Sequence, residues 1–69
     1  MKYTVKQARL LAGRTQKHMA RSLGVHVQTY RKIEQNPEKA TIKQAYIISK
    51  ETGIPYDNIF FDHNSTFGR

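Results

Sequence analysis

The sequence predicts an all-α fold, a compact bundle of five short helices joined by tight turns. Apolar residues recur three and four positions apart along most of the chain, which is the spacing of one helix face. Two capping boxes and several isolated glycines mark where helices would begin and end. No segment alternates polar and apolar residues as a half-buried strand does. With 69 residues, the chain has room for one domain and one small core.

The first two helices are bounded by polar caps and glycines. Thr4 and Gln7 have the spacing of a capping box, and Gly13 supplies a stop for the first helix. Thr15 is the expected N-cap of the second helix, which is short and ends at Gly24. The predicted inward faces are Val5, Ala8, Leu11 and Ala12 in the first helix and Met19, Ala20 and Leu23 in the second.

The third helix is expected to follow an N-cap at His26 and to run to Gln35, where Asn36 and Pro37 break it. A capping box at Thr41 opens the fourth helix, and Gly53 closes it. The predicted inward residues are Tyr30 and Ile33 in the third helix and Ile42, Ala45, Ile48 and Tyr46 in the fourth.

The end of the chain divides into a last short helix and a tail. Pro55 favours the start of a fifth helix over residues 56–60. Residues 62–69 are polar and without period, so we expect a frayed tail after a domain formed by residues 1–61.

Composition narrows the possible partners. Twelve Lys and Arg against five Asp and Glu give a net charge of +7, which favours a polyanion. The longest apolar run, Ala45 to Ile48, is far too short to span a bilayer, and Met1 to Thr4 lacks a signal-peptide core. Because the chain has no cysteine, it has no disulfide or thiolate metal site, and a reducing cytoplasm suits it.

The sequence offers no catalytic or metal-binding motif. The five acidic residues form no pair on one helix face that could act as general acid and base. The serines lack the strand-to-helix turn of a nucleophile, and the histidines lack the spacing of a helical zinc site; His18 is expected to be a solvated helix residue. We therefore predict no enzymatic activity, no cofactor and no metal.

The second and third helices flank a tight turn, residues 24–26, so that the third helix protrudes as in a helix-turn-helix. With Tyr30 and Ile33 inward, the opposite face carries mostly hydrogen-bond donors. Gln pairs with adenine, Arg with guanine, and Val meets a thymine methyl in a DNA major groove. The alternative is an ordinary solvated helix face. The outward residues are Val27, Gln28, Arg31 and Gln35, with Thr29 and Lys32 at the flanks.

The segment from Thr15 to Val25 resembles the T-Q-x-x-[LM]-A-x-x-L-G-V signature of the phage Cro and repressor-like helix-turn-helix family. The similarity extends over about residues 4–61, through the first helix at residues 6–9 and the closing segment at residues 56–61. It implies a lambda-repressor-like DNA-binding domain and a transcriptional regulator.

The resemblance also implies roles for single residues. Gln16 would brace a backbone phosphate at the start of the second helix, where the helix dipole favours negative charge. The positions that usually face bases are occupied by Val27, Gln28 and Arg31. The residues expected to touch the DNA backbone besides Gln16 are Thr15, Lys17, His26, Thr29, Lys32, Lys39 and Lys43.

Arg9 and Glu34 match a partly buried ion pair of the family, with a direct phosphate contact of Arg9 as the alternative. Three residues depart from the family pattern. His26 stands where Ser or Thr usually caps the recognition helix, and Arg14 replaces a common apolar residue. Asn36 replaces a frequent Gly, which is tolerable because Asn accepts the left-handed conformation.

These features predict a sequence-specific regulator of bacterial or phage origin, acting in the bacterial cytoplasm. One recognition helix reads few base pairs, so we expect a homodimer, at least on DNA, on a pseudo-palindromic operator with half-sites roughly 34 Å apart. A chain ending at Arg69 suggests a Cro-type regulator that dimerises through its own bundle or only on DNA. We expect Ile59 and Phe60 in the core and Phe61 at an interface.

Two other functions stay open. A protein-interaction module, such as an antirepressor or the DNA-binding half of an antitoxin, would show a larger exposed apolar patch. A non-specific architectural DNA-binder would use the charge without reading bases. A regulatory protein partner is compatible with any of the three functions.

Overall fold

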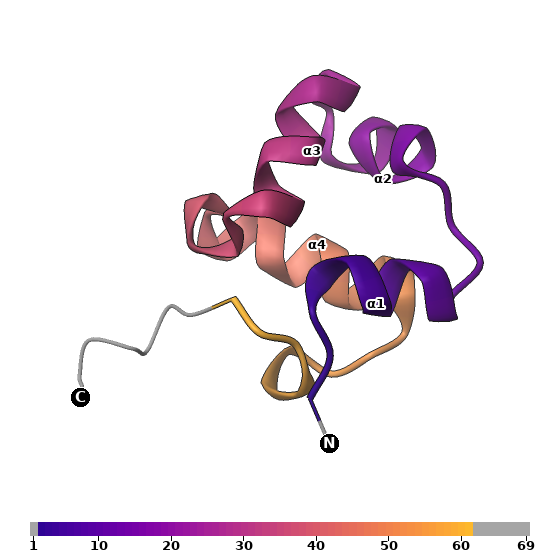
Figure 1. Ribbon diagram of the computed structural model, residues 1–69, viewed down its shortest axis with the longest axis vertical. Helices are drawn as coiled ribbons and strands as arrows, with labels where there is room; N and C mark the ends of the chain where they lie inside the picture. The colour runs from indigo at the N-terminus through magenta and orange to yellow at the C-terminus, as the bar shows by residue number, and fades with distance from the viewer. Residues whose placement is uncertain (1, 62–69) are drawn as a thin grey trace.

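The computed structural model describes residues 2–61, and the predicted tail at residues 62–69 lies outside them. The described chain is all-helical, with no strand (Figure 1). Four α-helices are confirmed, but the predicted fifth is only a 3-10 turn. The elements are α1 (Val5–Leu11), α2 (Gln16–Leu23), α3 (Val27–Gln35), η1 (Pro37–Lys39), α4 (Ile42–Thr52) and η2 (Tyr56–Asn58).

The helix ends follow the polar caps and glycines of the sequence. The hydroxyls of Thr4 and Thr41 each accept a hydrogen bond from the backbone amide three residues later, and the Gln at that position bonds back to the amide of the cap. Thr15 caps α2 in the same way without the reciprocal bond. Gly24, with φ of 71°, ends α2 in the left-handed conformation that a residue with a Cβ rarely adopts.

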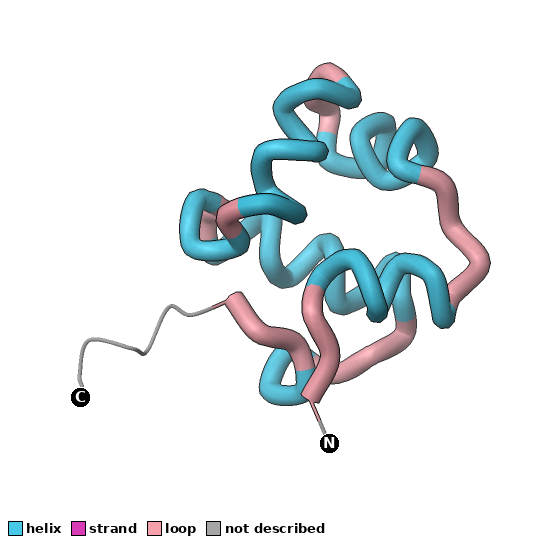
Figure 2. The backbone as a smooth tube through the Cα atoms, viewed as in Figure 1, coloured by secondary structure: helices cyan, strands magenta, loops and turns pink. Residues whose placement is uncertain are grey.

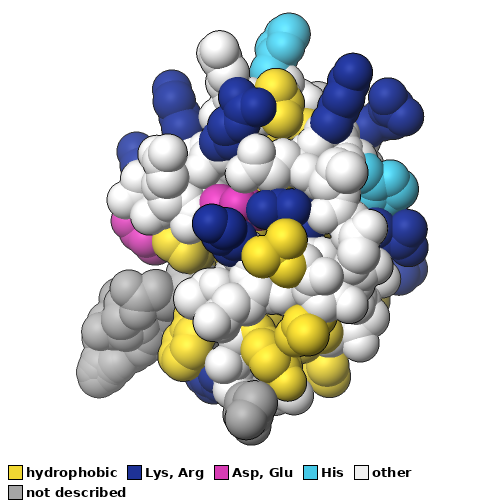
Figure 3. Space-filling model, turned by 45° about the vertical axis from the view of Figure 1, so that its right-hand side comes forward, with side chains coloured by type: hydrophobic (Ala, Val, Ile, Leu, Met, Phe, Trp, Pro, Cys, Tyr) yellow, Lys and Arg dark blue, Asp and Glu magenta, His cyan; other side chains and the backbone are white. Residues whose placement is uncertain are grey.

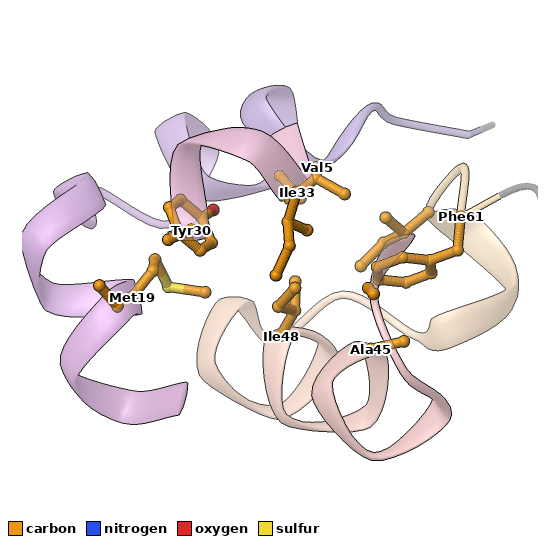
Figure 4. Packing of buried hydrophobic residues seen from close by; sticks show 11 residues of the cluster. Val5, Met19, Tyr30, Ile33, Ala45, Ile48 and Phe61 are labelled. Carbon is orange, nitrogen blue, oxygen red and sulfur yellow. The ribbon is translucent and has the colours of Figure 1, made fainter. Parts of the chain in front are cut away.

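The core lies between α1, α3 and α4, with α2 packed across one end (Figure 4). Its largest fully buried side chains are Val5, Met19, Tyr30 and Ile48. Ala8 and Ala45 are completely buried as well, and their small side chains let the helix backbones approach each other. The remaining buried hydrophobic residues are Ala20, Ile33, Ala40, Ile59 and Phe61.

The two ends of the described chain meet at a short parallel bridge between Tyr3 and Ile59. The amide of Tyr3 donates to the carbonyl of Asn58, and the amide of Phe60 donates to the carbonyl of Tyr3, both at 2.8 Å. The extended backbone at Ile59 makes successive side chains alternate in direction. Ile59 and Phe61 therefore point inward, and Phe60 points out.

The predicted roles of Phe60 and Phe61 were thus wrong. Phe61, expected at an interface, is 2% exposed and stacks on Tyr56 with ring centroids 5.2 Å apart. Phe60, expected in the core, is 50% exposed and lies under the ammonium group of Lys2. In a fifth α-helix, inward-pointing side chains would recur every three or four residues. In the extended segment, every second side chain points inward instead.

Besides Phe60, three hydrophobic residues expected inward are exposed instead, namely Leu11, Ile42 and Tyr46. In α1 the inward stripe contains Arg9 in place of Leu11, because the ion pair described below draws the arginine inward. In α4, Ile42 and Tyr46 are four residues apart and share an exposed face beside the buried stripe of Ala45 and Ile48.

Asn36 also differs from the expectation, since its φ of −137° is not left-handed. The ring of Pro37 disfavours helical backbone in the residue before it, and Asn36 accordingly lies outside the helical region, with ψ of 79°. The turn still directs the chain from α3 into η1. Within residues 2–61, no helix has the length and apolar character needed to cross a membrane.

Candidate nucleic-acid interface

The turn between α2 and α3 is short and tightly bonded (Figure 2). The amide of Val25 donates to the carbonyl of Ala20 at 3.0 Å, and that of Gly24 donates to the carbonyl of Arg21 at 3.1 Å. Val25 is half-buried against the core. His26 occupies the N-cap of α3 with extended backbone, but its exposed side chain makes no capping hydrogen bond. The imidazole is therefore left on the surface at the start of α3.

The outer face of α3 is polar and exposed. Tyr30 and Ile33 are buried, which confirms the predicted inward side of this helix. Val27 is half-buried and packs partly on the core, so only part of its side chain is available on the surface. The exposed residues of α3 are Gln28, Thr29, Arg31, Lys32 and Gln35.

A nearly buried ion pair ties α1 to the end of α3. Nε of Arg9 donates to Oε2 of Glu34 at 2.6 Å, and the two side chains are 9% and 6% exposed. Nη1 of Arg9 donates to the carbonyl of Arg14 at 3.1 Å. Because the guanidinium is turned into the protein, the alternative of a direct phosphate contact does not fit Arg9.

The pair keeps both of its members charged. The hydrogen bond to Glu34 raises the pKa of Arg9 despite partial burial. Burial alone would raise the pKa of Glu34, but the hydrogen bonds that its carboxylate accepts, first of all from Arg9, lower it below its ordinary value. The buried hydroxyl of Tyr30 makes no well-formed hydrogen bond within residues 2–61. Burial, and then the nearby Glu34 carboxylate, raise the pKa of Tyr30 and keep it neutral.

Gln16 connects this ion pair to the exposed face of α3. Its Nε2 donates to Oε1 of Glu34 at 3.0 Å, and its Oε1 accepts from Nε of Arg31 at 3.0 Å. The side chains of Arg9, Gln16, Glu34 and Arg31 therefore form one chain of hydrogen bonds across α1, α2 and α3. Sequence reasoning did not find the two contacts of Gln16, because they join residues 18 and 15 positions apart that no local spacing relates.

The other residues expected at the DNA backbone are all exposed, and they are spread over several elements. Thr15 and Lys17 lie at the start of α2, Lys39 lies in η1, and Lys43 lies in the first turn of α4. On the face shown in Figure 3, Lys and Arg gather over the end formed by α2 and α3, and most hydrophobic side chains lie toward the end with α1 and η2. On this face, the end that contains the helix-turn-helix is basic, and we call it the basic end.

His18 is not simply solvated as expected, because its Nε2 lies 2.9 Å from Oε1 of Glu51 and links α2 to α4. The hydrogen bond with His18 lowers the pKa of Glu51. Among residues 2–61, no group of three or more histidine, cysteine or acidic side chains is placed to hold a metal ion.

Comparison with protein families finds a match to the helix-turn-helix model over residues 5–59, which include all four α-helices. Comparisons with curated proteins and with solved structures find no match.

Proposed function

The chain belongs to the Cro and repressor-type helix-turn-helix family of DNA-binding domains, and from this membership we propose that it is a sequence-specific transcriptional regulator. The observation that carries the proposal is the outer face of α3, where Gln28 and Arg31 are exposed at the basic end of the molecule. Side chains that can bond two atoms of one base are needed only for reading sequence, whereas general attraction to DNA needs only charge.

In the proposed complex, α3 enters the major groove and Val27, Gln28 and Arg31 face the base edges. The second amide hydrogen of Gln16 bonds a phosphate beside the N-terminus of α2. Further phosphates are bound by residues around the groove, namely Thr15, Lys17, His26, Thr29, Lys32, Lys39 and Lys43. No step of this function requires a cofactor or a catalytic group.

We further propose that two copies bind a pseudo-palindromic operator, with half-sites roughly 34 Å apart. Since Phe61 is part of the core, the surface that joins the copies lies elsewhere on the domain. Residues 1–61 form the proposed DNA-binding unit, and the proposed location is the cytoplasm of a bacterium or of a phage host.

A protein-interaction module is the second candidate, as for an antirepressor or the DNA-binding half of an antitoxin. The observation that favours it is a shallow apolar groove on α1, lined by Tyr3, Gln7, Leu10 and Leu11. Leu10 and Leu11 are 57% and 64% exposed. Because no residue of α3 lines this groove, a protein partner and a DNA site are compatible on one molecule.

Selection of bound sites from a random duplex library tests the proposal, at roughly 150 mM salt so that non-specific phosphate binding is weak. A regulator enriches a pseudo-palindrome, whereas folded protein that enriches nothing contradicts sequence reading. Gln28→Ala should then relax the preference at one base pair in each half-site. The matched variant Lys39→Ala should weaken binding about equally on all sequences and flatten the salt dependence. If both variants behave alike, α3 does not read bases.

A further inference from the structure

Within the described residues, the guanidinium of Arg31 is hydrogen-bonded through Nε alone. Its Nε donates to Gln16, while its two terminal nitrogens, Nη1 and Nη2, have no hydrogen-bond partner within residues 2–61. The side chain is exposed at the basic end of the molecule. In an arginine bound in this way, Nη1 and Nη2 can both donate to one base. This pair of donors is the arrangement that bonds O6 and N7 of guanine.

The orientation of the Gln16 amide explains why it can hold Arg31. An amide has one oxygen that accepts and one NH2 group that donates. The NH2 group donates to the Glu34 carboxylate, which Arg9 keeps ionised. A reversed amide would bring its oxygen against that carboxylate and its NH2 group against the arginine. The buried ion pair therefore turns the amide oxygen toward Nε of Arg31.

We propose that Gln16 is a positioning residue for base recognition, which orients Arg31 so that the protein selects guanine at one position of each half-site. The inference rests on the proposed function. Arginine has many rotamers, and fixing it before binding reduces the entropy lost when it bonds a base. Glu34 and Arg9 contribute indirectly, because they fix the orientation of the Gln16 amide.

Gln16 also faces the DNA backbone in the proposed complex, so a simple loss of affinity would not distinguish the two roles. A phosphate contact contributes about equally on every sequence, whereas positioning of Arg31 affects one base preference. The readout is therefore the ratio of affinities for the selected operator and for operators with the other three base pairs at the position read by Arg31. That position is the one at which the Arg31→Ala variant no longer prefers guanine.

The test uses Gln16→Met, which keeps the length of the side chain but forms neither hydrogen bond, with Gln16→Ala as a second variant. Thermal unfolding followed by circular dichroism checks that each variant is folded. Arg31→Ala should reduce the guanine preference roughly tenfold or more. Gln16→Met should lose most of the same preference, and adding it to Arg31→Ala should not reduce the preference further.

Lys17→Ala is the matched control, since Lys17 is exposed beside Gln16 at the start of α2, whereas the hydrogen bond to Arg31 comes from Gln16. This variant should weaken binding on all sequences and keep the guanine preference. The inference is overturned if folded Gln16→Met keeps that preference, or if Arg31→Ala alters no base preference. If the wild-type protein itself prefers no sequence, the proposed regulator function fails as well.

Discussion

Arg9 and Glu34 lie 25 positions apart in the sequence, yet Nε of Arg9 is 2.6 Å from Oε2 of Glu34 and both side chains are nearly buried. The pair joins α1 to the last turn of α3. Its carboxylate also accepts the bond from Gln16, which leads to Arg31 on the surface. One contact thus contributes to the stability of the fold and sets the arrangement of the proposed base-reading face.

Removing one partner of this pair should destabilise the domain strongly. We expect Arg9→Ala to lower the free energy of unfolding by about 3 kcal/mol, because it leaves the Glu34 carboxylate buried without its cation. Urea denaturation measures this loss. The double variant Arg9→Met with Glu34→Leu removes both charges and should recover most of the stability. A double variant as unstable as Arg9→Ala would contradict this explanation.

The same pair predicts how stability depends on pH. Since the pKa of Glu34 is lower in the folded state than its ordinary value of 4.5, its stabilising effect is complete above that value. The effect is lost as pH falls through the lowered pKa, because the unfolded chain takes up the proton first. The free energy of unfolding should therefore fall as the pH drops below about 5, and less steeply in the Arg9→Met, Glu34→Leu double variant. Equal slopes would show that other carboxylates cause the loss.

The capping box of α4 should contribute a measurable share of stability. Thr41 accepts a hydrogen bond of 3.0 Å from the amide of Gln44, and the side chain of Gln44 bonds back to the amide of Thr41. Thr41→Ala should lower the free energy of unfolding by about 1 kcal/mol, measured by chemical denaturation. Thr41→Ser keeps the accepting hydroxyl and should stay near the wild-type value. A similar loss in both variants would argue against the cap.

The two adjacent phenylalanines should respond differently to truncation. Phe61→Ala should cost about 3 kcal/mol or more, since the ring is buried beside Tyr56. Phe60→Ala should change the free energy of unfolding by only about 0.5 kcal/mol, since its ring is half exposed. Thermal and urea unfolding of the two variants compare them directly. The opposite order would place Phe60 in the core, as the helical spacing had suggested.

Much of the local structure could be predicted because its causes are local. A threonine that caps a helix and a glycine that ends one act within four residues of the chain, so the bounds of α2 and α4 follow from Thr15, Gly24, Thr41 and Gly53. The inward positions of Tyr30 and Ile33 follow from helical spacing in the same way. The polar face of α3 opposite them could therefore be predicted as well.

Local patterns in the chain are therefore enough to predict the order of the helices, the helix-turn-helix and the polar residues that α3 exposes. The packing of distant segments places Phe61 rather than Phe60 in the core, because the bridge between Tyr3 and Ile59 makes the segment extended. It also decided the contacts of Gln16 with Glu34 and Arg31. Such contacts depend on how three helices pack together, and no periodicity within one helix contains that information.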